Sequence, residues 1–96
     1  MARSTISSTA SAGPILVTAR LMPSGGFSIQ YEIARMASTV SDAGGRWSLA
    51  LERNADIAPL GSWYLVTEHL PPAYGGPATH RIEVGPLNQT LYDALI

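Results

Sequence analysis

The feature that most constrains the fold of this chain is a strict alternation of apolar and polar residues. It is clearest in residues 27–34, where the apolar residues at every second position are Phe27, Ile29, Tyr31 and Ile33. A period of two turns one set of side chains into a core and the other toward solvent, as in a half-buried strand. Residues 46–52 and 79–84 repeat the pattern, with Ile82 and Val84 expected to point inward. The chain therefore predicts strands rather than helices.

Turn residues separate these strands at short intervals. Residues 15–21 predict a first strand, which ends at Pro23-Ser24-Gly25-Gly26. Asp42-Ala43-Gly44-Gly45 predicts a tight hairpin into the strand at 46–52, because glycine accepts the positive φ that such turns need. Trp47, Leu49 and Leu51 then share one face of that strand. Short strands with frequent turns and no long segment of helical period predict an all-β fold, a small antiparallel β-sandwich.

The second half of the chain continues the same organisation. Residues 53–62 read as an irregular connection whose Ile57 and Leu60 close the end of the core. Residues 63–70 are apolar on both faces at their start, as in a central strand, and the Pro- and Gly-rich residues 71–77 predict a loop. Residues 87–96 have apolar residues at roughly helical spacing; an edge strand or irregular structure is the prediction, with a turn of helix as the alternative.

The first residues of the chain differ in composition from the rest. Residues 1–13 are rich in Ser, Thr and Ala, and Ile6 is their single large apolar residue. Such a segment buries too little apolar surface to fold alone. We therefore predict an extended N-terminal arm over residues 1–13 and a β-sandwich domain over residues 14–96. Such an arm is either a floppy terminus or a segment that orders on a neighbouring subunit.

Charge and cysteine content exclude several classes of function. Charged residues make up 14% of the chain, against about 25% in an average soluble domain. A weakly charged surface favours a protein that contacts a partner. The six basic residues are scattered arginines and the net charge is −1, which argues against binding to a phosphate backbone. The absence of cysteine excludes disulfides, thiolate zinc sites and thiol nucleophiles. The N-terminus has no apolar region typical of a secretory signal, and no apolar run is long enough to span a membrane.

The polar residues predict no catalytic, cofactor or metal site. His69 and His80 lie in different predicted strands, and a metal site needs at least three converging ligands, so we expect both to face solvent. No serine lies in a Gly-x-Ser-x-Gly turn. The aromatic residues suggest either a sugar-stacking platform or packing in the core or between subunits, and Tyr74 is the one expected to be exposed. The residues predicted to contact a partner are Ile6, Ile15, Trp63, Tyr74, Leu95 and Ile96.

Four segments of the chain together resemble a small β-domain found in virion proteins of tailed phages of actinobacteria. They are Ser41-Asp42-Ala43-Gly44-Gly45-Arg46-Trp47-Ser48-Leu49, Asn54-Ala55-Asp56-Ile57-Ala58-Pro59, Gly61-Ser62-Trp63-Tyr64-Leu65-Val66-Thr67-Glu68 and His80-Arg81-Ile82-Glu83-Val84. The resemblance covers residues 14–86. It implies an immunoglobulin-like or prealbumin-like sandwich with a structural, non-enzymatic role and no cofactor.

Within this family, the domain occurs in tail-fibre and minor tail proteins and in small free-standing head proteins. Fibre proteins continue into a long shaft, whereas this chain stops at Ile96. The resemblance therefore implies a capsid decoration protein, assembled in the host cytoplasm, whose partners are the major capsid protein and copies of itself in a trimer. A minor tail, tail-fibre or head–tail adaptor component is the alternative, as is a carbohydrate-binding adhesion module.

Overall fold

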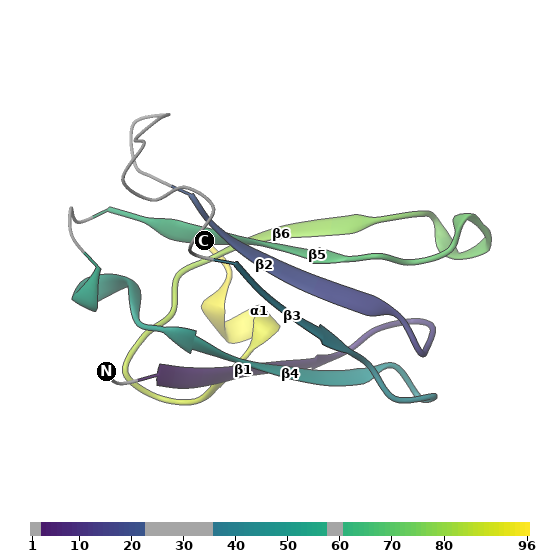
Figure 1. Ribbon diagram of the computed structural model, residues 1–96, viewed down its shortest axis with the longest axis horizontal. Helices are drawn as coiled ribbons and strands as arrows, with labels where there is room; N and C mark the ends of the chain where they lie inside the picture. The colour runs from purple at the N-terminus through teal and green to yellow at the C-terminus, as the bar shows by residue number, and fades with distance from the viewer. Residues whose placement is uncertain (1–2, 23–35, 58–60) are drawn as a thin grey trace.

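Two β-sheets packed face to face form the protein, as Figure 1 shows for the computed structural model. The structure describes residues 3–22, 36–57 and 61–96. In chain order the elements are β1 (Arg3–Thr9), β2 (Leu16–Met22), β3 (Met36–Val40), β4 (Arg46–Glu52), the 3-10 helix η1 (Asn54–Asp56), β5 (Trp63–Glu68), the 3-10 helix η2 (Pro72–Tyr74), β6 (Ala78–Ile82), β7 (Gln89–Thr90) and α1 (Leu91–Ala94). The smaller sheet has the order β4-β1-β7 and the larger one β3-β2-β5-β6. The prediction of a small all-β sandwich is thus confirmed.

Alternating residues of both sheets build the core between them. Trp47, Leu49 and Leu51 are all buried and share the inner face of β4, as predicted. They belong to one apolar cluster with residues of β2 and β5, such as Val17 and Val66, which have no exposed surface. Because side chains alternate along a strand, each sheet keeps one face for this core and one for solvent.

Residues 3–9 are a central strand of the smaller sheet, which corrects the prediction of an arm outside the domain. β1 pairs antiparallel with β4 over its whole length and parallel with β7. Ile6 has no exposed surface, and the buried Ser4 donates its hydroxyl proton to the carbonyl oxygen of Gly85 over 2.6 Å. Small hydroxyl side chains thus occupy a buried strand, because backbone pairing satisfies the main chain and large neighbours on β4 supply the apolar volume.

The turn at residues 42–45 lies where it was predicted, but the two strands that it joins belong to different sheets. β3 pairs with β2, whereas β4 pairs with β1, so the turn crosses from one layer to the other (Figure 1). The Asp42 side chain accepts hydrogen bonds from the backbone N–H groups of Gly44 and Arg46, at 2.9 and 3.0 Å. Local turn chemistry therefore fixed the reversal, while strand pairing depended on residues distant in the sequence.

A Gly45→Ala substitution in this turn is expected to destabilise the protein by about 3 kcal/mol. Gly45 has a φ of 87°, and a Cβ atom there would collide with the carbonyl oxygen of Ala10. The matched control is Gly44→Ala, whose Cβ would meet only the Asp42 side chain at 3.4 Å. Urea denaturation of the two variants measures the difference. Equal stability of both variants would contradict the strain that we assign to Gly45.

The second half of the chain folds largely as predicted. β5 occupies the predicted central position, and Ile82 and Val84 are buried at and beyond the end of β6. Ile57 is buried at the end of the core. Near it, the buried Asn54 side chain accepts a hydrogen bond from the Val84 backbone N–H at 2.7 Å and donates one to the Ser62 hydroxyl at 3.0 Å. The Asn54 side chain thus connects the segment between β4 and β5 to the residues that follow β6.

The C-terminal segment bridges the two sheets. After the two-residue strand β7 beside β1, the chain forms the four-residue helix α1, so both the strand and the helical turn considered for residues 87–96 are present. Leu95 then forms an isolated bridge to Ile82, at the end of β6 in the other sheet. The strand predicted at residues 27–34, the turn at 23–26 and the prediction for Leu60 lie outside the described residues.

Candidate functional site

The outward surface of the larger sheet is the feature most suited to bind a partner. We call it the outer face, and its strand residues are Leu16, Thr18, Arg20 and Met22 on β2, Met36, Ser38 and Val40 on β3, Trp63, Leu65 and Thr67 on β5, and Thr79 and Arg81 on β6. The register aligns these residues in rows across the sheet: Arg20 lies opposite Met36 on one side and Leu65 on the other, and Leu65 lies opposite Arg81.

Apolar side chains on this face are unusually exposed. Leu16, Met36 and Val40 are 45%, 57% and 64% exposed, and they lie on the adjacent strands β2 and β3. Single exposed apolar residues are common on protein surfaces. Here Leu16 and Val40 lie opposite each other on β2 and β3, whereas Met36 lies opposite Arg20, beyond the row of Thr18 and Ser38. The half-buried Leu65 lies on the other side of Arg20 from Met36, and the half-buried Trp63 lies opposite Met22. The outer face therefore exposes apolar side chains on both sides of a row of hydroxyl residues.

The charged strand residues of this face are both arginines, Arg20 and Arg81. They lie in the same row with Leu65 between them, so their Cα atoms are about 10 Å apart, since neighbouring strands are separated by almost 5 Å. The guanidinium carbon of Arg81 lies 4.2 Å from the centre of the Trp63 ring, a cation–π contact. Such stacking holds the guanidinium over the ring while its N–H groups can still donate to a carboxylate.

Only part of the predicted partner-binding set reaches a surface. Ile6 and Ile15 are 0% and 6% exposed and belong to the core, which corrects the prediction that they contact a partner. Trp63 lies on the outer face, and the backbone N–H of Ile96 donates to the carbonyl oxygen of Arg81 on the neighbouring strand at 3.0 Å. Trp63, Arg81 and Ile96 are far apart in the sequence and come together only in the folded chain.

Leu95 and Tyr74 are exposed but lie outside the set of strand residues that form the outer face. Leu95 is 45% exposed and bridges to Ile82 at the free side of β6. Tyr74 is 56% exposed, as expected, and lies in the loop between β5 and β6, which projects at one end of the sandwich (Figure 1). Tyr74 is thus remote from the Trp63 ring, whose face Arg81 covers. Trp63 and Tyr74 therefore do not form a pair of rings on which a sugar could stack.

A buried carboxylate links the two sheets at the end near the β3–β4 turn. Glu68 on β5 is 7% exposed, and its Oε2 accepts a hydrogen bond of 2.8 Å from the indole nitrogen of Trp47 on β4. Its Oε1 lies 3.2 Å from Nε2 of His80 on β6. His80 therefore points inward to a carboxylate, which corrects the prediction that it faces solvent, whereas His69 is exposed beside the Thr18 hydroxyl. The sequence gives no local sign of this cluster, because its members come from three strands.

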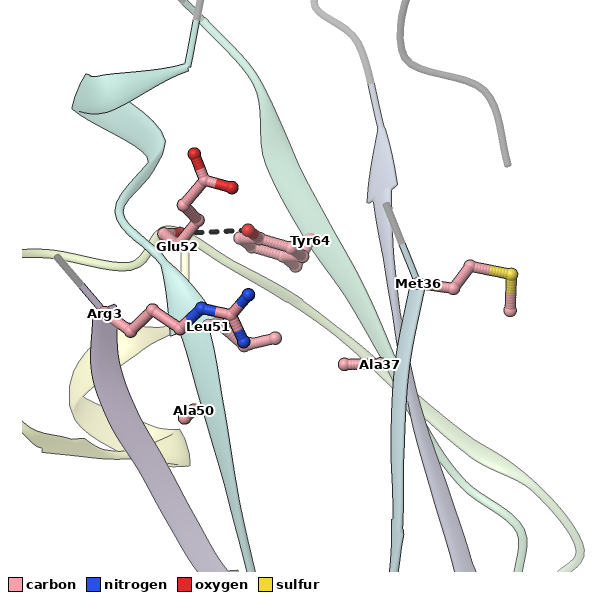
Figure 2. A pocket seen from close by; sticks show the side chains of 7 residues that line it. All are labelled: Arg3, Met36, Ala37, Ala50, Leu51, Glu52 and Tyr64. Atoms are coloured by element: carbon pink, nitrogen blue, oxygen red, sulfur yellow. Dashed lines mark hydrogen bonds between the residues drawn. The ribbon is translucent and has the colours of Figure 1, made fainter. Parts of the chain in front are cut away.

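A groove of about 340 Å³ opens between the edges of β3 and β4 at the other end of the sandwich (Figure 2). The Tyr64 hydroxyl spans the two sheets there and donates to the backbone carbonyl of Glu52 at 2.9 Å. Figure 2 shows the Tyr64 ring and Leu51 directed into the gap, while the Met36 side chain points away from it. The lining contains no histidine, serine or threonine among the described residues, so it offers no base–nucleophile pair.

The described part of the chain holds no group of three or more His, Cys, Asp or Glu side chains placed to bind a metal ion. Among the same residues, no helix has the length and apolar character to cross a membrane. Comparison of the chain with protein-family models, with curated proteins and with solved structures finds no match. Its function therefore has to follow from the chemistry of its own surface.

Proposed function

We propose that this chain is a non-enzymatic structural protein of a phage particle, a decoration protein that binds the exterior of the major capsid shell and stabilises it. In this proposal the outer face of the larger sheet is the docking surface. The resemblance in residues 14–86 suggests the setting, and the chemistry of the outer face suggests the mode of binding. The protein acts by covering shell surface and adding contacts, without a cofactor.

The exposed apolar group on β2 and β3 is the observation that carries this proposal. Leu16, Met36 and Val40 are 45% to 64% exposed in the isolated chain, and burying them against a shell would stabilise the complex at about 25 cal/mol per Å². Arg20 lies opposite Met36, Arg81 lies in the same row beyond Leu65, and the strand residues of the face include no carboxylate. The partner surface would therefore present carboxylates opposite the two arginines and apolar groups opposite the exposed apolar residues.

Repetition on a symmetric shell makes such a surface sufficient. A sheet face of a small domain is a modest interface, and area alone does not give high affinity. Many identical sites on one particle, together with contacts between neighbouring copies, add to the effective affinity. A minor tail or head–tail component could use the same face, and the two roles differ in how many copies a particle carries.

Copy number per purified particle is the deciding measurement, made by quantitative mass spectrometry against the major capsid protein. A decoration protein is expected in an amount comparable with that of the shell protein. A number matching a single vertex would assign the chain to the tail or portal instead, and absence from particles would refute the virion role.

Charge reversal on the outer face tests the docking surface itself. Arg81→Glu is expected to weaken binding to stripped particles by about 10-fold, because it places a carboxylate where the partner is proposed to be acidic. The matched control is Arg46→Glu, an exposed residue on β4 of the other sheet. Co-sedimentation of each variant with particles gives the apparent Kd. Equal binding by both variants would show that the outer face is not the docking surface.

A further inference from the structure

β3 is an edge strand without the features that usually protect such an edge. It lies at one end of the order β3-β2-β5-β6 and pairs on one side only among the described strands. Its sequence, Met36-Ala37-Ser38-Thr39-Val40, has no charge and no proline. Edge strands normally carry charges, proline or bulges, because an open edge pairs readily with another strand.

Among the described strands, the other edges are either short, as in the two-residue β7, or better protected. β4 carries Arg46 and Glu52 at its two ends. The end of β6 is covered by the C-terminal segment, whose backbone exchanges hydrogen bonds with Arg81 and Glu83: Ile96 donates to the Arg81 carbonyl at 3.0 Å, and Glu83 donates to the Ala94 carbonyl at 2.9 Å. The free side of β3 is therefore the most favourable place on the described surface for strand addition.

The backbone phase shows which groups of β3 point outward. The backbone N–H of Ser41 donates to the carbonyl oxygen of Ile15 at 2.9 Å. From the opposite side of β2, the backbone N–H of His69 donates to the carbonyl oxygen of the next residue, Leu16, also at 2.9 Å. Backbone groups of an antiparallel strand alternate between its two neighbours. In the observed register, Ala37 and Thr39 therefore bond to β2, whereas the backbone groups of Met36, Ser38 and Val40 point away from the sheet.

This pattern is self-complementary. If two copies of β3 run antiparallel about a two-fold axis at Ser38, the outward groups of Ser38 meet those of Ser38 in the second copy. The outward groups of Met36 then meet those of Val40 in the second copy, and the reverse pair forms on the other side of the axis. Every outward N–H would face a carbonyl, as the backbone of a hydrogen-bonded antiparallel pair requires.

The side chains agree with the same register. Met36 and Val40 are 57% and 64% exposed, and the pairing places each beside the other on the outer face. Leu16 lies opposite Val40 on β2 and continues the apolar row within each copy. Ala37 and Thr39 on the inner side are small enough to let the strands approach. No charged residue of β3 opposes another, because the strand has none, so no like charges meet at the seam.

We propose that two copies of this chain pair through β3, antiparallel and with Ser38 on the two-fold axis, to form one continuous sheet. Each copy contributes its four strands, so the joined sheet has 4 + 4 = 8. An isologous pair of this kind is closed, because the outer side of β3 in each copy is used once. It differs from the trimer that the family resemblance implies, and it stands independently of any role on a particle.

A single cysteine tests the axis directly. The chain has no cysteine, so Ser38→Cys introduces the sole thiol. Hydrogen-bonded antiparallel partners have Cα atoms about 5.5 Å apart, within the range of about 4.4–6.8 Å that a disulfide spans. We expect Ser38→Cys to give a covalent dimer upon mild oxidation. The control Ser48→Cys, at an exposed position of β4, is expected to give at least about 10-fold less covalent dimer.

Ser38→Pro tests the hydrogen bonds of the seam. Proline removes the outward N–H while leaving the bonds of Ala37 and Thr39 to β2, and proline is tolerated at edges where the N–H faces solvent. We expect the apparent dimer Kd from analytical ultracentrifugation to rise at least about 10-fold. In the second variant, Val40→Lys, an ammonium group replaces the apolar side chain that faces Met36 of the second copy, so the dimer Kd is expected to rise as well. Circular dichroism confirms that each variant is folded.

Three results would overturn the proposal. The first is a wild-type chain that remains monomeric at all concentrations reached in the centrifuge. The second is a trimer, since a closed β3 pair has no third position. The third is a dimer that folded Ser38→Pro and Val40→Lys leave unchanged, because another surface would then hold it together.

Discussion

Deletion of residues 1–9 is expected to unfold the whole domain. β1 is the middle strand of the smaller sheet, paired with β4 on one side and β7 on the other. Its removal would separate β7 from the sheet and expose the inner face of β4. The total free energy of unfolding of a small domain is about 5–15 kcal/mol. The stabilisation lost with a central strand is larger than this, so the rest of the domain cannot stay folded. The expected result is the loss of the cooperative urea transition followed by tryptophan fluorescence.

Ile6→Ala measures the same contribution within an intact chain. Ile6 has no exposed surface, and truncating such a side chain to alanine costs about 2–5 kcal/mol, whereas Ile6→Val costs about 1 kcal/mol. Ser11→Ala, at an exposed position just after β1, is the control and is expected to change stability by less than about 0.5 kcal/mol. A truncated chain that unfolds at the same midpoint as the full chain would show that β1 is a dispensable arm.

The position of β1 also changes how truncation experiments on function are interpreted. A floppy or partner-ordered arm could be removed without harm to the domain, so that lost binding would identify a contact. Because residues 3–9 are integral to the fold, loss of particle binding after deletion would report unfolding. Point substitutions on the outer face, with Arg46→Glu as control, separate docking from folding.

The sequence predicted those elements whose signal is local. Trp47, Leu49 and Leu51 alternate with small or polar residues, and the structure buries all three. The Asp42 side chain and the positive φ of Gly45 define a turn within five residues. Such features depend on the period of a strand and on the conformational freedom of glycine, which neighbouring residues alone determine.

Features created by strand pairing could not be predicted in the same way. β1 lacks the apolar content of a central strand, and its burial depends on β4, which lies some 40 residues later in the chain. The turn at residues 42–45 resembled a hairpin, because nothing local distinguishes a turn within a sheet from one between sheets. The outer face likewise required the register, which brings Arg20, Leu65 and Arg81 into one row.

Glu68→Ala is expected to destabilise the protein by about 3 kcal/mol, since it leaves a buried indole N–H without an acceptor. The carboxylate accepts a hydrogen bond from the Trp47 indole N–H at 2.8 Å and lies 3.2 Å from Nε2 of His80. Glu68→Gln retains an oxygen acceptor and is expected to cost about 1 kcal/mol. Urea denaturation at a single pH gives the free energy of unfolding of each variant.

A double-mutant cycle with Trp47→Phe distinguishes the hydrogen bond from the packing of the indole ring. Phenylalanine keeps an aromatic ring in the core but has no N–H, so Glu68→Ala should cost less in that background. The expected coupling is about 1–2 kcal/mol, within the range for residues in direct contact. If the two substitutions are additive to within about 0.5 kcal/mol, the Trp47–Glu68 bond does not tie the sheets together, and the stability of this end of the sandwich rests on apolar packing alone.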